Sequence, residues 1–203
     1  MSLVAAAARP HSIRAFAAER RVVRRTHETS PMTQYAIVAF PDTDALEIIE
    51  AIRQRFDPQV RLIAAHITLV FPFQSSDSLG AIRSHVAKVA ASTAPFRVYL
   101  AGVRIGDGEY LYLDIDEGRE NVIALHQQLY TGPLAGVMSA ERLYEPHVTI
   151  GRIANVQTLD DARLHAAEVV PESHATIDAL TIFRLDAPDK GTVDARVPLG
   201  AGS

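Results

Sequence analysis

Two short stretches of the chain place a histidine and a threonine two residues apart inside an apolar run. His66 and Thr68 form the first pair, and His147 and Thr149 form the second. Residues i and i+2 of a β-strand point to the same face, so each stretch presents its His and its Thr together. Burying such polar groups without partners costs free energy. The repetition therefore indicates that the two stretches share a function.

The side-chain types indicate chemistry at phosphorus. Two imidazoles facing each other across a cleft can share an in-line displacement, one as general base and the other as general acid. Two Thr hydroxyls can donate hydrogen bonds to phosphoryl oxygens as charge builds there. The chain has no Cys, no His-Glu-x-x-His and no cluster of carboxylates beside either His. This pattern favours an acid and a base over metal ligands, so we assign no metal site and expect no cofactor.

A third match to the same tetrad begins at His174, with Thr176 two residues later. A single tetrad is therefore a weak signal. The counterpart of this stretch, 78 residues earlier, begins at Phe96 in a strand that we expect to be structural. We interpret His174 as a structural histidine at the start of a strand and retain His66 and His147 as the equivalent pair.

Two further residues are weaker candidates for binding substrate. Arg152 follows the second motif and can clamp phosphate oxygens at two points, although strand parity turns it away from His147. Tyr144 carries an aromatic ring that can stack on a nucleobase. Phe71 has the opposite parity to Thr68, so we expect it in the core. The remaining histidines outside the N-terminal tail are expected on helices without a catalytic role: His85, His126 and His165.

The composition is that of an ordinary globular protein. The 203 residues are 48% hydrophobic and 22% charged, with a formal net charge of −4 and no Cys. No apolar run approaches the ~20 residues that a membrane-spanning helix requires, so we expect no membrane association and a cytoplasmic, monomeric protein. Residues 1–31 hold six Arg and two Glu, which leaves the rest of the chain with a net charge of −8. That charge argues against a long nucleic-acid interface and favours a small anionic ligand.

The first 31 residues are rich in Ala and Arg and resemble a transit peptide in composition. Met32 is followed at once by a strand-like run, so we expect residues 1–31 to be a dispensable or disordered extension and residues 32–203 to form the domain. A targeting role for the extension is the alternative.

From residue 35 onward the hydrophobic pattern predicts two passes of one unit, each ordered strand, helix, His-x-Thr strand, helix, strand. The two passes are offset by about 75 to 81 residues, which indicates an internal duplication with halves at roughly 32–105 and 106–199. The expected elements of the first pass are a strand at 35–40, a helix at 42–56, the His66 strand, a helix at 78–91 and a strand at 96–105. Those of the second pass are a strand at 110–115, a helix at 117–130, the His147 strand, a helix at 158–169 and a strand at 175–185, followed by an edge strand at 192–199.

At His66-Ile-Thr-Leu and His147-Val-Thr-Ile the chain resembles the 2H phosphoesterase superfamily, and within it the bacterial 2'-5' RNA ligase (LigT-like) family. The resemblance extends over roughly residues 32–199. It implies an α+β fold of two pseudo-symmetric lobes, with mainly antiparallel sheets flanked by helices and an active cleft between them. It also implies a metal-independent phosphodiesterase that opens 2',3'-cyclic phosphates to 2'-phosphates.

Carried over residue by residue, the resemblance implies that His66 donates a proton to the leaving 3'-oxygen and that His147 activates water. It further implies that Thr68 and Thr149 hold the phosphate. The expected partner is a small nucleotide or an RNA end bearing a 2',3'-cyclic phosphate. Two alternatives remain open at this point: RNA-end joining or 2'-5' linkage processing, and a nucleotide-binding module without turnover.

Overall fold

The computed structural model describes residues 34–74, 78–138, 143–187 and 190–200, which belong to one compact unit, Met32–Ser203. The predicted extension at residues 1–31 lies outside the described residues. Eight strands form a single antiparallel sheet: β1 (Gln34–Ala39), β2 (Ile67–Phe73), β3 (Phe96–Gly106), β4 (Tyr110–Ile115), β5 (His147–Arg152), β6 (Ser173–Ile177), β7 (Ala179–Ala187) and β8 (Lys190–Pro198). The helices are α1 (Leu46–Phe56), α2 (Leu79–Ala91), α3 (Arg119–Leu129), α4 (Val156–Val169) and the 3₁₀ helix η1 (Gly132–Val137). This α+β architecture confirms the predicted fold class.

The strand order is β6-β3-β4-β5-β2-β1-β7-β8, and it is symmetric about the junction of β5 and β2. We call β6-β3-β4-β5 the His147 half and β2-β1-β7-β8 the His66 half. A single residue pair, Ile67 with Val148, joins the two halves. These residues directly follow the two histidines, so the pseudo-two-fold axis passes beside both motifs.

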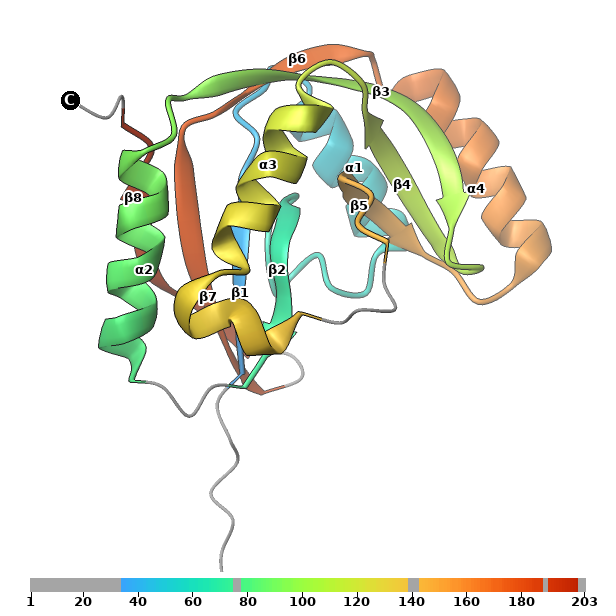
Figure 1. The fold of residues 1–203 in the computed structure, drawn as a ribbon. Coiled ribbons are helices and arrows are strands. Elements are labelled where there is room, and N and C mark those ends of the chain that lie inside the picture. The colour runs from blue at the N-terminus through green and yellow to red at the C-terminus, as the bar shows by residue number, and fades with distance from the viewer. Residues whose placement is uncertain (1–33, 75–77, 139–142, 188–189, 201–203) are drawn as a thin grey trace, which may run out of the picture. The chain divides into compact units, whose positions relative to one another are not determined.

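Each half of the sheet combines strands from both passes of the chain. β3 pairs with β4 and β6, while β1 pairs with β7. The predicted division at residues 105 and 106 is therefore wrong as a boundary between halves, because the last strand of each pass crosses over to pair in the other half. The helices follow the same exchange: α1 packs on β5 and α4 on β3 and β4, whereas α2 packs on β7 and β8 and α3 on β2 (Figure 1).

Two local predictions also need correction. The helix predicted from residue 42 begins at Leu46, because the backbone of Asp42 instead pairs with Thr176 through hydrogen bonds of 3.0 and 2.9 Å. The strand predicted at residues 175–185 is two strands, β6 and β7, separated by Asp178. The carbonyl of Asp178 accepts a hydrogen bond from the Leu199 amide (2.7 Å), which takes it out of the ladder.

Local sequence accounts well for the remaining elements. Ser78 caps α2 by accepting a hydrogen bond from the Ala81 amide, and Asn155 caps α4 through Thr158 in the same way. Along β2, alternate side chains separate the two faces of the sheet: Ile67 and Leu69 enter the main hydrophobic core beneath the helices. The opposite face of the sheet is left free to build a pocket.

Candidate active site

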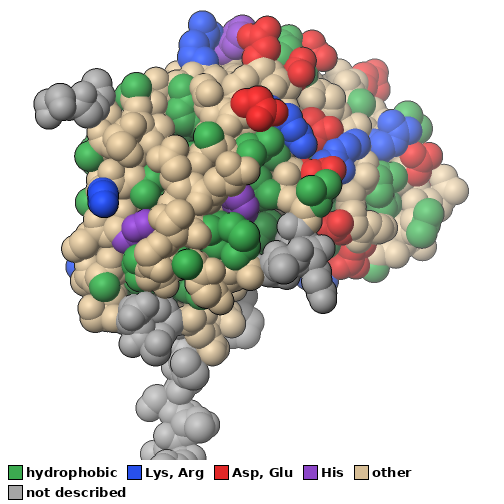
Figure 2. Space-filling model, in the orientation of Figure 1, with side chains coloured by type: hydrophobic (Ala, Val, Ile, Leu, Met, Phe, Trp, Pro, Cys, Tyr) green, Lys and Arg blue, Asp and Glu red, His purple; other side chains and the backbone are tan. Residues whose placement is uncertain are grey.

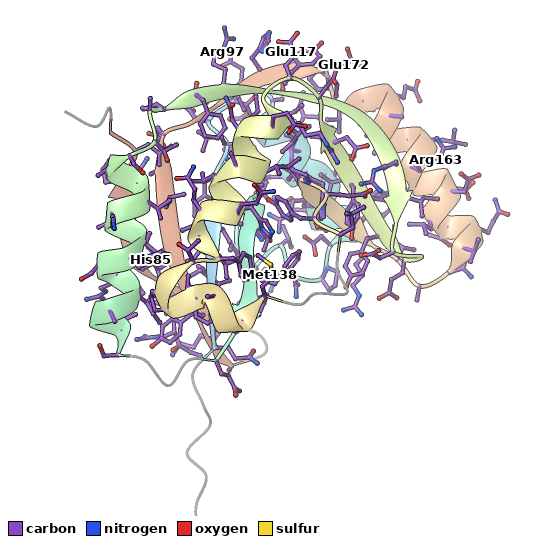
Figure 3. The ribbon with its side chains drawn as sticks, viewed as in Figure 1. His85, Arg97, Glu117, Met138, Arg163 and Glu172 are labelled. Carbon is purple, nitrogen blue, oxygen red and sulfur yellow. The ribbon has the colours of Figure 1, made fainter. Side chains whose placement is uncertain are left out.

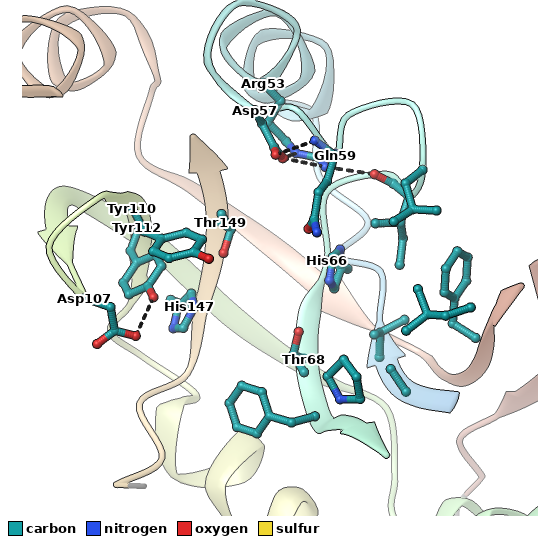
Figure 4. A pocket seen from close by; sticks show the side chains of 18 of the residues that line it. Arg53, Asp57, Gln59, His66, Thr68, Asp107, Tyr110, Tyr112, His147 and Thr149 are labelled. Carbon is teal, nitrogen blue, oxygen red and sulfur yellow. Dashed lines mark hydrogen bonds and ion pairs between the residues drawn. The ribbon is translucent and has the colours of Figure 1, made fainter. Parts of the chain in front are cut away.

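A pocket of about 950 Å³ lies on this second face, and all four motif side chains line it: His66, Thr68, His147 and Thr149. Figure 4 shows His66 and Thr68 on one strand and His147 and Thr149 on its neighbour, turned toward a common space. The bridge between Ile67 and Val148 holds the two strands in this register. The predicted constellation is thus brought together by the junction of the two halves.

The two histidines have the same local geometry. Nδ1 of His66 lies 2.8 Å from the Ala64 carbonyl oxygen, and Nδ1 of His147 lies 2.7 Å from the Glu145 carbonyl oxygen. A carbonyl only accepts, so each Nδ1 carries the hydrogen and donates it. In the neutral ring the lone pair is then on Nε2, the atom left for chemistry in the pocket.

A buried ion network holds the chain that leads into His66. Arg53 is 1% exposed and lies on α1. Its guanidinium donates to Glu50 (2.9 Å), to Asp57 (3.0 Å) and to the Ile63 carbonyl (2.8 Å). Glu50 also accepts from the Ala65 amide. Because the residues just before His66 are tied to one helix, the His66 ring has a rigid support.

The His147 half uses different contacts. The His147 ring stacks on Tyr112 of β4, with 3.6 Å between centroids and 19° between planes. The Tyr112 hydroxyl donates to the Asp107 carboxylate (3.0 Å). Arg104 lies over the Tyr112 ring and pairs with Asp114 and Glu145, both at 2.8 Å. Sequence analysis missed this arrangement; the alternation of Tyr110, Tyr112 and Asp114 opposite the His147 strand was the signal that could have indicated it.

Burial lowers the pKa of both histidines. The pKa of His66 falls from 6.5 to about 4, chiefly because the ring loses solvent and also because Arg53 places positive charge nearby. The pKa of His147 is likewise lowered, first by burial and then by Arg104, against the opposing effect of its bond to the Glu145 carbonyl. Both rings are therefore neutral bases near pH 7 in this structure.

The same register shift of the β-bulge type occurs in both His-x-Thr strands. On β2 it lies between Thr68 and Val70, and on β5 it lies between Thr149 and Gly151. A bulge adds one residue and reverses the parity beyond it. Phe71, which parity assigned to the core, consequently lines the pocket, so that prediction is wrong.

Arg152 and Tyr144 lie outside the pocket lining. Arg152 pairs with Glu109 (2.7 Å) and lies over the ring of Tyr110, which does line the pocket. The Tyr144 hydroxyl donates to the Thr68 carbonyl (2.9 Å), and its ring stacks on His126 at 3.6 Å. In this structure Tyr144 braces β2 instead of facing the pocket.

Among the described residues, the other histidines do not line the pocket. His174 is exposed on β6 and contacts the Tyr99 ring at 4.9 Å. His85 lies on α2 and bonds to the Leu129 carbonyl at 3.0 Å (Figure 3). Arg97, Glu117 and Glu172, labelled in the same view, do not line the pocket either. Across the four described ranges, no group of three or more His, Cys, Asp or Glu side chains is placed to hold a metal ion.

No helix among the described residues is long and apolar enough to cross a membrane.

The chain is similar to known proteins in sequence and in fold. The family model described as "2'-5' RNA ligase superfamily" matches residues 40–189. A protein of Geobacillus sp. (strain WCH70), named "Putative phosphoesterase", is 32% identical over 122 residues, which cover 59% of this chain and 69% of that protein. Another of the same description, from Geobacillus thermodenitrificans (strain NG80-2), is 30% identical with the same coverage.

Solved structures share the fold at low identity. E. coli LigT in apo form has a TM-score of 0.59 and 17% identity, and the match covers 83% of this chain and 98% of that one. TT0787 of Thermus thermophilus has a TM-score of 0.57 and 17% identity, covering 84% and 99%. With a family model that spans most of its length and includes both His-x-Thr motifs, the chain belongs to the 2'-5' RNA ligase superfamily of 2H phosphoesterases.

Proposed function

We propose that this protein is a metal-independent phosphodiesterase that opens 2',3'-cyclic phosphates, on a nucleotide or an RNA end, to 2'-phosphates by two-histidine acid–base catalysis. The observation that carries the proposal is the matched pair of histidines at the junction of the two halves. Each ring has its Nδ1 on a main-chain carbonyl, which puts the lone pair of the neutral ring on Nε2. Both rings line one pocket with the hydroxyls of Thr68 and Thr149.

In the proposed reaction, one neutral imidazole takes a proton from water as the water oxygen attacks phosphorus. The other ring, protonated, gives its proton to the 3'-oxygen as the P–O3' bond breaks, so the phosphate stays on the 2'-oxygen. A bound phosphate anion raises the pKa of a neighbouring histidine because it favours the charged ring. That effect would supply the protonated partner although burial keeps both rings neutral near pH 7.

The threonines suit the charge of the substrate. A cyclic phosphate is a monoanion, and neutral hydroxyl donors can stabilise its non-bridging oxygens as charge develops. Thr68 and Thr149 occupy equivalent positions, opposite Val38 of β1 and Tyr112 of β4 respectively. We propose that they hold one phosphoryl oxygen each.

The charges around the pocket support a small substrate. Its described lining includes Asp57, Asp107 and Glu145, and the Arg53 guanidinium there is already paired with carboxylates. Figure 2 shows acidic and basic side chains intermixed over the described surface of one face, without a continuous basic stripe. A solved structure of E. coli LigT holds 3'-AMP, a nucleotide of the size proposed here. Long RNA would gain less from such a surface.

The test is turnover of 2',3'-cyclic mononucleotides in EDTA, with the phosphate position of the product assigned by phosphorus NMR. Wild type is compared with His66→Ala and His147→Ala, and His174→Ala serves as the matched control from the third tetrad. We expect a 2'-phosphate product that disappears in the first two variants and persists in the control.

Four outcomes contradict the proposal in different ways. Turnover that EDTA abolishes would contradict metal independence, and a 3'-phosphate product would contradict the stated regiochemistry. Absence of turnover on cyclic mononucleotides, RNA ends and 2'-5' dinucleotides would favour a nucleotide-binding module. Joining of RNA ends, with an affinity that falls steeply with salt, would favour the ligase alternative.

A further inference from the structure

The two histidines differ in what touches them. The His147 ring is stacked face to face on Tyr112, with 3.6 Å between centroids. The aromatic neighbour of His66 is Phe40, which is edge-on at 6.3 Å. The residue of the His66 half equivalent to Tyr112 is Val38, since each faces the motif threonine of the adjacent strand. An aliphatic side chain offers no π-face to an imidazole.

The turn between β3 and β4 brings Asp107 to the hydroxyl of Tyr112. Asp107 and Gly108 have φ values of 46° and 77°, as expected for Asp and Gly in a tight hairpin turn. A Cβ on Gly106 would overlap the Tyr112 ring, so Gly at 106 is what leaves room for the ring. Tyr112 itself is buried, with 6% of its surface exposed.

We propose that Tyr112 and Asp107 are positioning residues that hold the His147 ring and stabilise its protonated form, a device that His66 lacks. The electron-rich face of a phenol attracts a cation stacked on it. The Asp107 carboxylate accepts the phenol hydrogen (3.0 Å) and adds negative charge on the same side. Burial and this bond raise the pKa of Tyr112, so the phenol stays protonated at working pH.

The other charged groups around His147 come from three elements. Arg104 of β3 opposes the imidazolium, while Asp114 of β4 favours it. Glu145, in the segment before β5, supplies the carbonyl that accepts from Nδ1 and also pairs with Arg104. His66, the residue directly before β2, lines the same pocket. Stabilising the imidazolium helps His147 in either role, because an acid begins the step protonated and a base becomes protonated during it.

The experiment titrates both motif histidines by NMR in the intact protein, with signals assigned from His66→Gln and His147→Gln. Tyr112→Leu removes the π-face, and we expect the pKa of His147 to fall by ~0.5 pH unit or more while that of His66 stays in place. Asp107→Asn should lower the pKa of His147 in the same direction. Tyr112→Phe keeps the stacked ring and loses only the hydroxyl bond, so the pKa of His147 should fall less in this variant than in Tyr112→Leu.

Two variants in the same region act as matched controls. Tyr110→Phe alters a pocket tyrosine two residues away on the same strand, whose ring is 6.0 Å from Tyr112. Glu109→Gln removes one negative charge close to Asp107, from a carboxylate that pairs with Arg152. Neither should move the pKa of His147. A His147 pKa unchanged in Tyr112→Leu, or moved equally by the controls, would overturn the inference.

Turnover provides a second readout, which rests on the proposed phosphodiesterase activity. In the pH profile of kcat/KM, one limb should shift in Tyr112→Leu and Asp107→Asn while the other limb stays fixed. A merely structural role would lower the whole profile without moving one limb. The NMR titration needs no substrate, so failure of the proposed function and failure of this inference can be distinguished.

Discussion

The His66 half and the His147 half share a backbone and differ in side chains. Both place a histidine before the same bridge, tie its Nδ1 to the carbonyl two residues earlier and carry a register shift after the threonine. Around His66 the pocket wall combines the polar side chains of Arg53, Asp57 and Gln59 with apolar side chains from Ala36, Val38, Leu62, Ile63, Phe183 and Leu185. Around His147 it is aromatic and polar, with contributions from Tyr110, Tyr112, Asp107 and Glu145.

The comparison distinguishes the features that acid–base chemistry requires in both halves from the features that can differ between the halves. The tautomer, the ring orientation and the neighbouring hydroxyl depend on backbone geometry, and they are the same in both halves. The surroundings decide how readily each ring takes a charge, and they have diverged. The two halves are also held differently, His66 by a buried arginine and His147 by a stacked tyrosine.

The largest expected effect comes from removing either histidine. His66→Ala and His147→Ala should each lower kcat by ~10²-fold to ~10⁴-fold on cyclic phosphates, since each removes one of the two proton-transfer groups. A nucleotide p-nitrophenyl ester carries a leaving group that needs no proton, so only the variant lacking the acid should recover on it. The measurement is kcat on both substrates. Recovery of kcat on this ester in both variants, or in neither, would contradict the assignment of one histidine as acid and the other as base.

The next largest effect is on stability and compares the two arginines. Arg53→Met leaves Glu50 and Asp57 without their buried partner and should lower the free energy of unfolding by roughly 3–5 kcal/mol. Arg104→Met removes a partner that is 35% exposed and should cost only about 0–1 kcal/mol. Urea denaturation of the three proteins tests the difference. Equal losses would show that the two halves are braced alike.

The threonines should have smaller and similar effects. Thr68→Val and Thr149→Val each remove one hydrogen bond to a charged oxygen, which corresponds to a loss of roughly 10-fold to 10²-fold in kcat. Thr176→Val, the equivalent change in the third tetrad, serves as the control and should leave kcat unchanged. Steady-state kinetics give the comparison. A loss confined to one threonine would break the proposed symmetry of phosphate binding.

The last prediction concerns the pH dependence of stability. Because the pKa of His66 is about 4 in the folded chain against 6.5 ordinarily, the unfolded chain binds more protons at this site between these pH values. The free energy of unfolding should therefore fall as the pH is lowered from about 6.5 to about 4. His66→Gln should flatten that slope, and His174→Gln, at an exposed position, should not. Denaturation at several pH values measures both, and an unchanged slope in His66→Gln would contradict a depressed pKa.

Local sequence patterns predicted most of the described helices and strands, and two kinds of error show where such patterns fail. Hydrophobic periodicity placed the strands and helices within a few residues, because side-chain alternation and helix caps are local. It failed at Asp42 and Asp178, whose backbone groups bond to Thr176 and Leu199. It failed again at Phe71, because a bulge reverses parity and depends on the pairing of β2 with β1.

The sequence by itself determined the two His-x-Thr motifs, their repeat and the family, since these depend only on residue types and spacing. Tertiary structure alone decided the rest of the site. It exchanges the last strands between halves, places Tyr112 and Asp107 against His147, and ties the residues before His66 to Arg53. The physical reason is that these contacts join residues distant in the chain, and their strength depends on burial, which no local pattern records.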